Sequence, residues 1–401
     1  MKGTVHSSTN IRVRTCPTWT AEIPVCSEAK TPACGSIVAA MIIISLIHCR
    51  IFGKLNGYLL NRIRHAFSIK SGTIKVMKKF DLVIVGEGIS GLYAAYLAFR
   101  RFPQWNIALI ADSSRLAPCS YRTTAVVSQS GIHLGVSPLG DLLFNGFQAF
   151  CEHVANDRPD GIYSGTRFHL SSDGCDAFKK RWPNGRLQQL ATLKKELFVE
   201  QEETFLVDPH EYLAWLKSQM TVHFFTGLVT SVESGRVISD HLDILGDRIF
   251  LANGAYARHT PIQLKSHAPT KNYLDGSRVV PGKFALFQLC DWGEESFVLS
   301  HGHANLIYRA WSGEVLIGGT TNKNESLDDQ GELQKQINFF AELVNFDLPK
   351  AVHVDTGLRH KGMQRKPALL ELSTNVWALW GTYKNGWSLP HFMLKDWIEK
   401  I

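Results

Sequence analysis

The stretch Asp81-Leu-Val-Ile-Val-Gly-Glu-Gly-Ile-Ser-Gly-Leu-Tyr-Ala-Ala95 joins an apolar strand, a glycine-rich turn and an amphipathic helix. In such a unit Gly86 permits the tight turn, Gly88 lets the backbone approach a pyrophosphate and Gly91 lets the helix pack closely on the strand. Free N–H groups at the helix start face the phosphates. The stretch therefore predicts dinucleotide binding, by Gly86, Gly88, Ile89, Ser90 and Gly91.

The residues after this helix complete a nucleotide-binding unit. Residues 106–112 form a second apolar segment that ends in Asp112, an acid placed to bind a ribose hydroxyl. A glycine-rich turn alone is a weak signal, because such turns also serve close packing, but the flanking elements and the terminal acid supply the required context. We expect buried parallel strands over Phe80–Val85 and Ile107–Ala111, connected by a helix over Ile89–Phe102.

The composition is that of a globular chain whose positive charge is confined to one end. With 401 residues, 45% apolar and 20% charged, the chain can bury a large core in one large or two interleaved domains. It has 43 Lys or Arg and 36 Asp or Glu, of which residues 1–76 hold ten and two. The body therefore holds 33 basic and 34 acidic residues, and a nucleic-acid partner is not favoured.

The cysteines and one histidine pair do not predict a metal centre. The eight cysteines are scattered without a CxxC pair, which is typical of reduced thiols in a cytosolic protein. His301 and His303 lie two residues apart and can face the same way on a strand, so a metal site is the alternative. No nearby Cys or carboxylate completes a ligand set, so we expect no metal and a cytoplasmic protein.

Residues 1–76 form an extension with more than one interpretation. Residues 31–49 carry no charge, but their apolar core at 37–47 is shorter than the roughly 20 apolar residues of a membrane-spanning helix. The core also lies far from the N-terminus for a secretory signal. If residues 31–53 are an anchor, the basic residues that follow keep the body on the cytoplasmic side. Because Met77-Lys-Lys-Phe-Asp leads straight into the nucleotide-binding strand, we favour upstream sequence read through from an early start codon.

The rest of the body shows no internal repeat or long linker. Asp208-Pro opens a helix expected to run to Met220, followed by strand-like segments at residues 222–225 and 229–233. A buried strand at residues 247–256 runs into a second glycine turn, where a nucleotide-binding sheet again meets its ligand. Alternating patterns predict antiparallel strands at residues 283–289, 296–300, 305–309 and 314–318, and a helix is expected over residues 333–344.

Four further motifs follow one another in the order typical of one flavoprotein family. They are Leu251-Ala-Asn-Gly-Ala-Tyr256, Gly313-Glu-Val-Leu-Ile-Gly-Gly-Thr320, Gly357-Leu-Arg359 with Lys366-Pro367, and Gly381-Thr-Tyr-Lys-Asn-Gly386. Together with the first glycine turn, they make residues 77–401 resemble the FAD-dependent D-amino-acid oxidase (DAO) family, and glycine oxidase most among its members.

The resemblance implies an α/β fold with noncovalent FAD as the cofactor. A Rossmann-like FAD-binding domain would be interleaved with an α+β substrate domain built on an antiparallel sheet. We expect the FAD-binding domain at residues 77–155, 204–265 and 355–401, and the substrate domain at residues 156–203 and 266–354, after the extension at residues 1–76.

The resemblance also implies how a substrate is held. The arginine of the Gly-Leu-Arg motif, here Arg359, would clamp the substrate carboxylate, a task that suits its planar and permanently charged fork. Lys384 takes the place of a basic residue that lies near the substrate in glycine oxidase. The alternatives are a salt bridge for Arg359 and a solvated loop lysine for Lys384.

Further residues are implied to surround the flavin. Backbone N–H groups of the Gly381–Gly386 loop, which opens a helix over Trp387–Lys400, would lie beside the pyrimidine end of the flavin. The Cys119–Ala125 loop offers hydroxyl donors, for which turn stabilisation is the alternative. The implied FAD-binding residues are Ser120, Thr123, Thr124, Val229, Asn253, Gly254, Gly381, Lys384, Asn385 and Gly386.

Some residues depart from the glycine oxidase pattern, and they bear on the substrate rather than on the flavin. The departures are His360 in place of proline, the basic Lys361 and Arg365, Thr382 in place of histidine, Pro390-His391 at the start of the last helix, and Tyr308-Arg-Ala-Trp311 on the sheet.

We therefore expect FAD-dependent oxidation of a small amine or amino acid. The Cα–H would pass as a hydride to flavin N5, the resulting imine would hydrolyse, and O2 or another acceptor would take the electrons. Two alternatives stay open. One is a flavoprotein acting on a modified nucleoside or large amine, whose phosphates would meet Lys361, Arg365 and Lys366. The other is a flavin-binding partner protein without turnover.

Overall fold

The computed structural model describes residues 11–16, 19–23, 78–112, 118–233, 235–259, 263–264, 268–288, 290–321 and 331–401. Residues 1–72 and 73–401 form two separate compact units. In the first unit, β1 (Ile11–Cys16) pairs antiparallel with β2 (Trp19–Ile23). The apolar segment at residues 31–53, with its competing interpretations, lies outside the described residues. Within the described ranges, no helix is both long and apolar enough to cross a membrane.

The body opens with the expected parallel βαβ unit. β3 (Lys79–Val85) pairs parallel with β4 (Ile107–Ala111), and α3 (Ile89–Arg101) connects the two strands. Residues 82–84 of β3 are fully buried, because packed elements cover both faces of the parallel sheet. The two predicted strands and the predicted crossover helix are therefore confirmed.

Other strands extend this first sheet on both sides of β3 and β4. β9 (His223–Thr226) pairs parallel with β4, while β12 (Asp243–Leu251) pairs parallel with both β3 and β20 (Val376–Trp380). The sheet is completed by β10 (Val229–Glu233), β11 (Arg236–Ser239), β13 (Gln263–Leu264) and β19 (Ala368–Ser373).

The register of the parallel strands brings three carboxyl ends together. Val85 lies beside both Ile110 of β4 and Leu251 of β12. The next residues continue the contact, since the Gly86 N–H donates to the Ile110 carbonyl at 2.8 Å and the Ala252 N–H donates to the Val85 carbonyl at 2.8 Å. Ligands of such sheets bind outside the carboxyl ends of the strands, so this edge positions the site.

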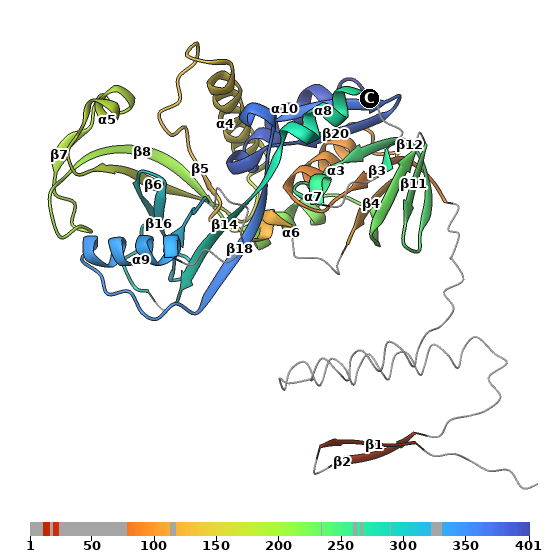
Figure 1. Ribbon diagram of the computed structural model, residues 1–401, viewed down its shortest axis with the longest axis horizontal. Helices are drawn as coiled ribbons and strands as arrows, with labels where there is room; N and C mark the ends of the chain where they lie inside the picture. The colour runs from red at the N-terminus through yellow and green to blue at the C-terminus, as the bar shows by residue number, and fades with distance from the viewer. Residues whose placement is uncertain are drawn as a thin grey trace, which may run out of the picture. The chain divides into compact units, whose positions relative to one another are not determined.

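Helices cover one face of the first sheet, as Figure 1 shows, and bury its larger core. α3 lies against α6 and α10, and α10 also lies against α4. The residues packed there include Leu92, Tyr212, Leu394 and Trp397, all almost fully buried. The added helices are α4 (Pro138–Asp157), α6 (Pro209–Ser218) and α10 (Leu389–Ile398).

Two helix starts follow from local chemistry. The Asp208 carboxylate accepts hydrogen bonds from the first turn of α6, as the Asp-Pro pair predicted. α10 begins at Leu389, two residues later than expected, and Pro390 lies in its first turn, where no N–H is needed for the helix. His391 is fully buried, with its Nε2 2.9 Å from the Tyr212 hydroxyl, so it belongs to the core.

The second sheet is mostly antiparallel, as predicted. Its order is β18-β14-β17-β16-β15-β6-β8-β5, with β7 on β8, and β15 pairs with β6 in parallel. In Figure 1 the long strands β14 and β18 run side by side at one edge of this sheet. The strands are β5 (Val126–Val127), β6 (Ile162–Ser171), β7 (Arg186–Gln188), β8 (Leu197–Val207), β14 (Arg278–Phe287), β15 (Phe297–His301), β16 (Ala304–Arg309), β17 (Glu314–Gly318) and β18 (His353–Lys361).

The inner strands of this sheet are buried on both faces rather than on one. Leu306 and Ile317 pack in one cluster with α9, whereas Val298, Ile307 and Leu316 pack in another on the opposite face. Alternate residues of these strands therefore pack into two different apolar clusters, one on each face of the sheet, and neither face of these strands is exposed to solvent. The remaining helices are α5 (Asp176–Arg181), α7 (Tyr256–His259), α8 (Ala268–Gly276) and α9 (Gly331–Leu343).

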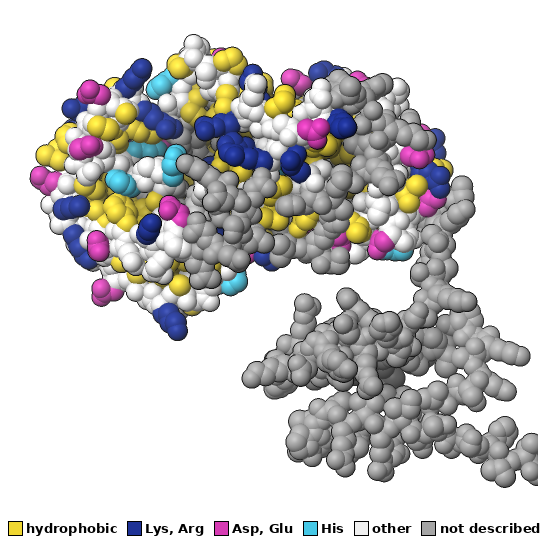
Figure 2. All heavy atoms as spheres, viewed as in Figure 1, with side chains coloured by type: hydrophobic (Ala, Val, Ile, Leu, Met, Phe, Trp, Pro, Cys, Tyr) yellow, Lys and Arg dark blue, Asp and Glu magenta, His cyan; other side chains and the backbone are white. Residues whose placement is uncertain are grey.

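The expected α/β class, with a Rossmann-like sheet and a second antiparallel sheet, is confirmed. The exact domain boundaries stay a prediction. Figure 2 shows charged side chains of both signs over the visible face, with a gathering of Lys and Arg side chains near its middle.

Candidate active site

One cavity of about 410 Å³ collects nearly all the predicted site residues. It opens at the carboxyl edge of the first sheet and is closed on another side by β6, β16 and β18 of the second sheet. The predicted residues that line it are Gly86, Gly88, Ile89, Ser90, Asp112, Ser120, Thr123, Thr124, Val229, Asn253, Gly254, Arg359, Gly381, Lys384, Asn385 and Gly386. Gly91 does not line it.

The glycine turn after β3 is held by close backbone packing. Gly86 has a φ of +112°, and a Cβ added there would lie 2.4 Å from the Ala252 carbonyl oxygen. A Cβ at Gly91 would lie 1.9 Å from the Gly86 carbonyl oxygen, so no side chain fits between α3 and the turn. Gly91 is therefore a packing residue, as the motif predicted, and not a ligand contact.

The start of α3 has the features of a phosphate site. Gly88 is its N-cap without a side-chain hydrogen bond, and the first turn holds no acid. A helix N-terminus of this kind favours anions, because its N–H groups and dipole are both positive. Across the edge, Gly254 has a φ of +52° and a Cβ there would meet no atom within 4 Å, so the space before it is open. These residues fit the pyrophosphate of a dinucleotide.

The hydroxyls of the Cys119–Ala125 loop are partly used by the protein itself. The Ile89 N–H donates to Ser120 Oγ at 3.0 Å, and the Ala125 N–H donates to Thr123 Oγ1 at 3.3 Å. Thr123 therefore stabilises its own turn, the alternative left open by the sequence, whereas Ser120 ties the loop to the start of α3. Each hydroxyl keeps its own proton for donation to a ligand.

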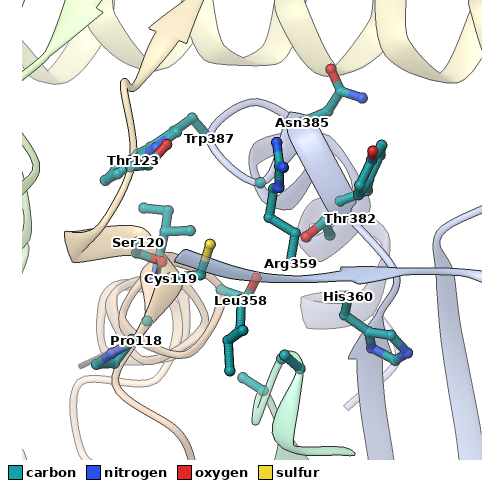
Figure 3. A pocket seen from close by; sticks show the side chains of 18 of the residues that line it. Pro118, Cys119, Ser120, Thr123, Leu358, Arg359, His360, Thr382, Asn385 and Trp387 are labelled. Carbon is teal, nitrogen blue, oxygen red and sulfur yellow. Dashed lines mark hydrogen bonds between the residues drawn. The ribbon is translucent and has the colours of Figure 1, made fainter. Parts of the chain in front are cut away.

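Arg359 projects from β18 into the cavity, while Leu358 and His360 point to the other side of the strand (Figure 3). Its Nε–H donates to the Val280 carbonyl at 3.4 Å, and Nη2 donates to the carbonyls of Pro281 at 3.0 Å and Thr320 at 2.5 Å. Burial lowers the pKa of Arg359 from its usual value.

No carboxylate among the described residues pairs with Arg359, so the salt-bridge alternative does not hold within them. The bonds to three carbonyls use Nε and both protons of Nη2, and they leave Nη1 without an acceptor in the described part of the chain. The guanidinium is thus fixed in place and offers one nitrogen to a ligand, rather than the whole fork that the sequence predicted.

Two residues that shape this region were missed from the sequence. A Cβ at Gly282 of β14 would lie 2.0 Å from Nη2 of Arg359, so only glycine leaves room for the guanidinium. Tyr383, with a φ of +53°, places its ring 5.4 Å from the guanidinium carbon. The predicted loop at residues 381–386 contains a short 3-10 turn at Tyr383–Asn385, which positions the ring. No sequence signal marked Gly282, and Tyr383 stood in a motif without an assigned role.

Lys384 lies at the rim of the same region. Its Nζ is 6.0 Å from the centre of the Tyr383 ring. The residue as a whole is exposed, yet the protein packed around its ammonium and the charges of Arg359 and Lys361 lower its pKa to about 8. Its place in the cavity lining and beside the Tyr383 ring supports a role near a ligand, and the solvated-lysine alternative stays open.

Arg167 of β6 is a further cation in the cavity that the sequence did not reveal. Its guanidinium donates to the hydroxyls of Ser128 and Ser130 at 2.7 and 2.6 Å, to Ser300 Oγ at 2.9 Å and to Asn305 at 3.3 Å. Burial lowers its pKa to about 10. These partners lie on separate strands and loops, so the sequence held no local pattern that could have revealed the cluster.

The histidine pair and the cysteines have structural surroundings. His301 ends β15 with its ring 4.7 Å from that of Phe339, and His303 follows in the turn. Among the described residues no three His, Cys, Asp or Glu side chains gather as a metal site would require. Cys119, Cys151, Cys175 and Cys290 are free thiols.

Comparison with known proteins agrees with this geometry. The fold resembles glycine oxidase from Geobacillus kaustophilus, with 15% identity, a TM-score of 0.62, and coverage of 80% of this chain and 95% of that one. It also resembles iminodiacetate oxidase from Chelativorans sp. BNC1, with 16% identity, a TM-score of 0.63, and coverage of 78% and 93%.

A third similar structure is L-alpha-glycerophosphate oxidase from Mycoplasma pneumoniae with FAD bound, at 13% identity, a TM-score of 0.63, and coverage of 80% and 94%. No curated protein matched the chain in sequence. Residues 81–391 match the DAO family, described as FAD dependent oxidoreductase. The match spans most of the chain, and the glycine turn, the open space before Gly254 and the start of α3, with glycine as its N-cap and no acid in its first turn, suit the cofactor. This chain therefore belongs to the DAO family of FAD-dependent oxidoreductases, and its cofactor is FAD.

Proposed function

We propose that this FAD-dependent oxidoreductase oxidises a small amino acid or related amine whose acidic group is held by Arg359. The observation that carries the proposal is a guanidinium that lines the cavity, is fixed by three backbone carbonyls and has no carboxylate partner among the described residues. A charge kept partly out of water without a partner is costly, so a bound anion would stabilise it.

Arg359 would act by orienting the substrate. Its bonds to Val280, Pro281 and Thr320 hold the side chain in place, so little freedom is lost when Nη1 donates to a substrate carboxylate. FAD, when bound, supplies the acceptor for the two electrons of the oxidation. The oxidised product would be an imine, which water hydrolyses to an oxo acid and ammonia.

The similar structures support an acidic substrate class. They are named for the oxidation of glycine, iminodiacetate and glycerophosphate, each of which carries at least one anionic group at neutral pH. Their low identity to this chain carries the fold alone, so the substrate has to be found by experiment.

The test is anaerobic mixing of the purified yellow protein with a panel of amino acids while the flavin absorbance is followed. Bleaching by at least one amino acid is expected. No bleaching with any of them, in a protein that carries FAD, would favour a substrate of another class or a flavin-binding partner protein.

Variants of Arg359 then test the clamp. Arg359→Ala should keep its FAD but lose about 2–5 kcal/mol of interaction with the acidic substrate, whereas Arg359→Lys should recover part of it. Reduction by the decarboxylated amine should change little. Arg236→Ala, at a partly exposed arginine that pairs with Asp243 and does not line the cavity, is the matched control and should behave like the parent. Equal losses for acid and amine would show that Arg359 is structural.

A further inference from the structure

Three cations surround the ring of Tyr383, and we name them the cation cluster: Arg359, Lys361 and Lys384. The Arg359 guanidinium carbon lies 5.4 Å from the ring centre, and the Lys361 and Lys384 ammonium nitrogens lie at 5.6 and 6.0 Å. A bridge between Lys361 and Thr382 ties β18 to the turn that carries the ring. Arg359 and Lys361 are two residues apart on β18, so they leave the strand on the same face.

The charge of the cation cluster is not balanced by the described residues. None of its three members forms an ion pair with a described carboxylate. Burial is the main cause that lowers the pKa of Lys361. The charges of two further cations, Arg278 and Arg365, lower this pKa as well. Like charges this close destabilise one another, so the arrangement is unfavourable until an anion enters it.

One anchored carboxylate would leave most of this charge unused. Arg359 has only Nη1 to offer, whereas Lys361 and Lys384 bring two more ammonium groups to the same ring. All three cations lie within 6.0 Å of the same ring centre. Arg359 and Lys384 line the cavity, and Lys361, which does not line it, leaves β18 on the same face as Arg359. Tyr383 itself adds a π-face that attracts cations and holds the cation cluster together.

We propose that the substrate carries a second acidic group, which Lys361 and Lys384 bind while Arg359 binds the first. The inference rests on the proposed function and narrows it to acidic amino acids, imino diacids or amino acids that bear a phosphate. The shared chemistry is two anionic groups on one small amine.

The ionisation of Lys384 gives this proposal a signature. Burial, with the charges of Arg359 and Lys361, lowers the pKa of its ammonium to about 8, so the lysine is a cation below that pH and loses its charge above it. The groups that face it are Arg359 and Lys361 from β18 and the Tyr383 ring from its own turn. Binding of a diacid should therefore weaken as the pH rises through about 8, whereas binding of a monoacid to Arg359 should not.

The experiment compares succinate with butyrate, which has the same number of carbons but one carboxylate, as ligands of the FAD-loaded full chain. Binding is followed by the change in flavin absorbance. At pH 7 succinate should bind about tenfold tighter or more, because it gains charge-assisted hydrogen bonds. Lys384→Met and Lys361→Met should each reduce the ratio of the two affinities severalfold. At pH 9.5 the ratio for the parent protein should approach that of Lys384→Met.

Lys366→Met is the matched control, because Lys366 is an exposed lysine of the same basic run that is not one of the three cations around the Tyr383 ring. It should leave the ratio unchanged. Equal binding of succinate and butyrate, or an equal effect of Lys366→Met and Lys384→Met, would overturn the second acidic group. If neither ligand binds and Arg359→Ala changes nothing, the proposed function itself fails, so the two failures are distinguishable.

A second experiment, which measures flavin reduction, then distinguishes a carboxylate from a phosphate as the second acidic group. Flavin reduction is measured with both enantiomers of aspartate, glutamate, alanine and O-phosphoserine, and with iminodiacetate. Faster reduction by the carboxylate diacids or by the phosphate compound identifies the second group. Alanine reducing the flavin as well as all of them would contradict the inference.

Discussion

The two ends of the cavity differ in which part of the chain forms them, backbone at one end and charged side chains at the other. The cofactor end is made of backbone, because Gly86 and Gly91 pack without side chains and Gly254 faces open space. The end that we propose for the substrate is made of charged side chains around the Tyr383 ring. Steric fit therefore governs the first end and charge governs the second. Substitutions at the cofactor end should therefore abolish folding or FAD binding altogether. Substitutions at the other end should lower the substrate affinity in graded amounts.

Gly91→Leu should have the largest effect, because a side chain there would overlap the Gly86 carbonyl, whose oxygen is 1.9 Å from the position of a Cβ. The turn is held on its other side as well, because a Cβ at Gly86 would already lie 2.4 Å from the Ala252 carbonyl oxygen. We expect no folded protein. Circular dichroism and a thermal melt on the purified chain check this, and a cooperative melt near that of the parent would contradict it.

Gly88→Leu should have the second largest effect, because it should abolish FAD binding while the protein still folds. A Cβ at Gly88 would be 3.1 Å from Ser120 Oγ and 3.7 Å from Pro118, so the Ser120 hydroxyl would have to shift slightly, and the longer side chain would enter the cavity. We expect a folded, colourless protein without FAD. Absorbance at flavin wavelengths and the melt of the apoprotein check the two parts separately. A yellow variant with full FAD content would show that Gly88 serves only close packing.

His360 allows a comparison of two neighbouring side chains on one strand. It follows Arg359 on β18, is buried and points to the opposite side of the strand. Burial lowers the pKa of His360 to about 4, below the usual 6.5. The unfolded chain therefore binds a proton between these values that the folded chain does not, and stability falls as the pH drops below 6.5.

Replacing this histidine by a neutral residue should remove that dependence. Between pH 7 and pH 5 the parent should lose about 2 kcal/mol more stability than His360→Gln. Other buried histidines are present in both proteins, so their contribution cancels in the difference. Denaturant unfolding of the FAD-loaded proteins at the two pH values provides the measurement, and parallel losses would contradict the expectation.

Gly282→Ala should have the smallest effect and the most graded one. The added methyl would lie 2.0 Å from Nη2 of Arg359 and push the guanidinium away from its carbonyl partners, without touching a ligand. We expect about a tenfold weaker interaction with the acidic substrate and normal FAD content. The double variant with Arg359→Ala should lose no more than Arg359→Ala alone. Additive losses would mean that Gly282 acts independently of the arginine.

The contrast also explains what the sequence could and could not predict. Glycine turns, apolar strands and the Asp-Pro helix start have local steric causes, and the corresponding elements lie within a few residues of their predicted ends. Gly282, Tyr383 and Arg167 act through neighbours distant in the chain, so their roles depend on strand pairing that no local pattern encodes. The partial use of the Arg359 fork likewise depends on the positions of three backbone carbonyls.

The pairing of β12 with both β3 and β20 has a consequence for the order of events during synthesis. The first glycine turn leaves the ribosome early, but Gly254 follows much later and Gly381 comes near the end of the chain. Because the cavity needs all three, a nascent chain has no complete place for FAD until β20 and α10 have been made. We expect a chain ending at Ser373 to carry no flavin, and a yellow product from it would contradict this order.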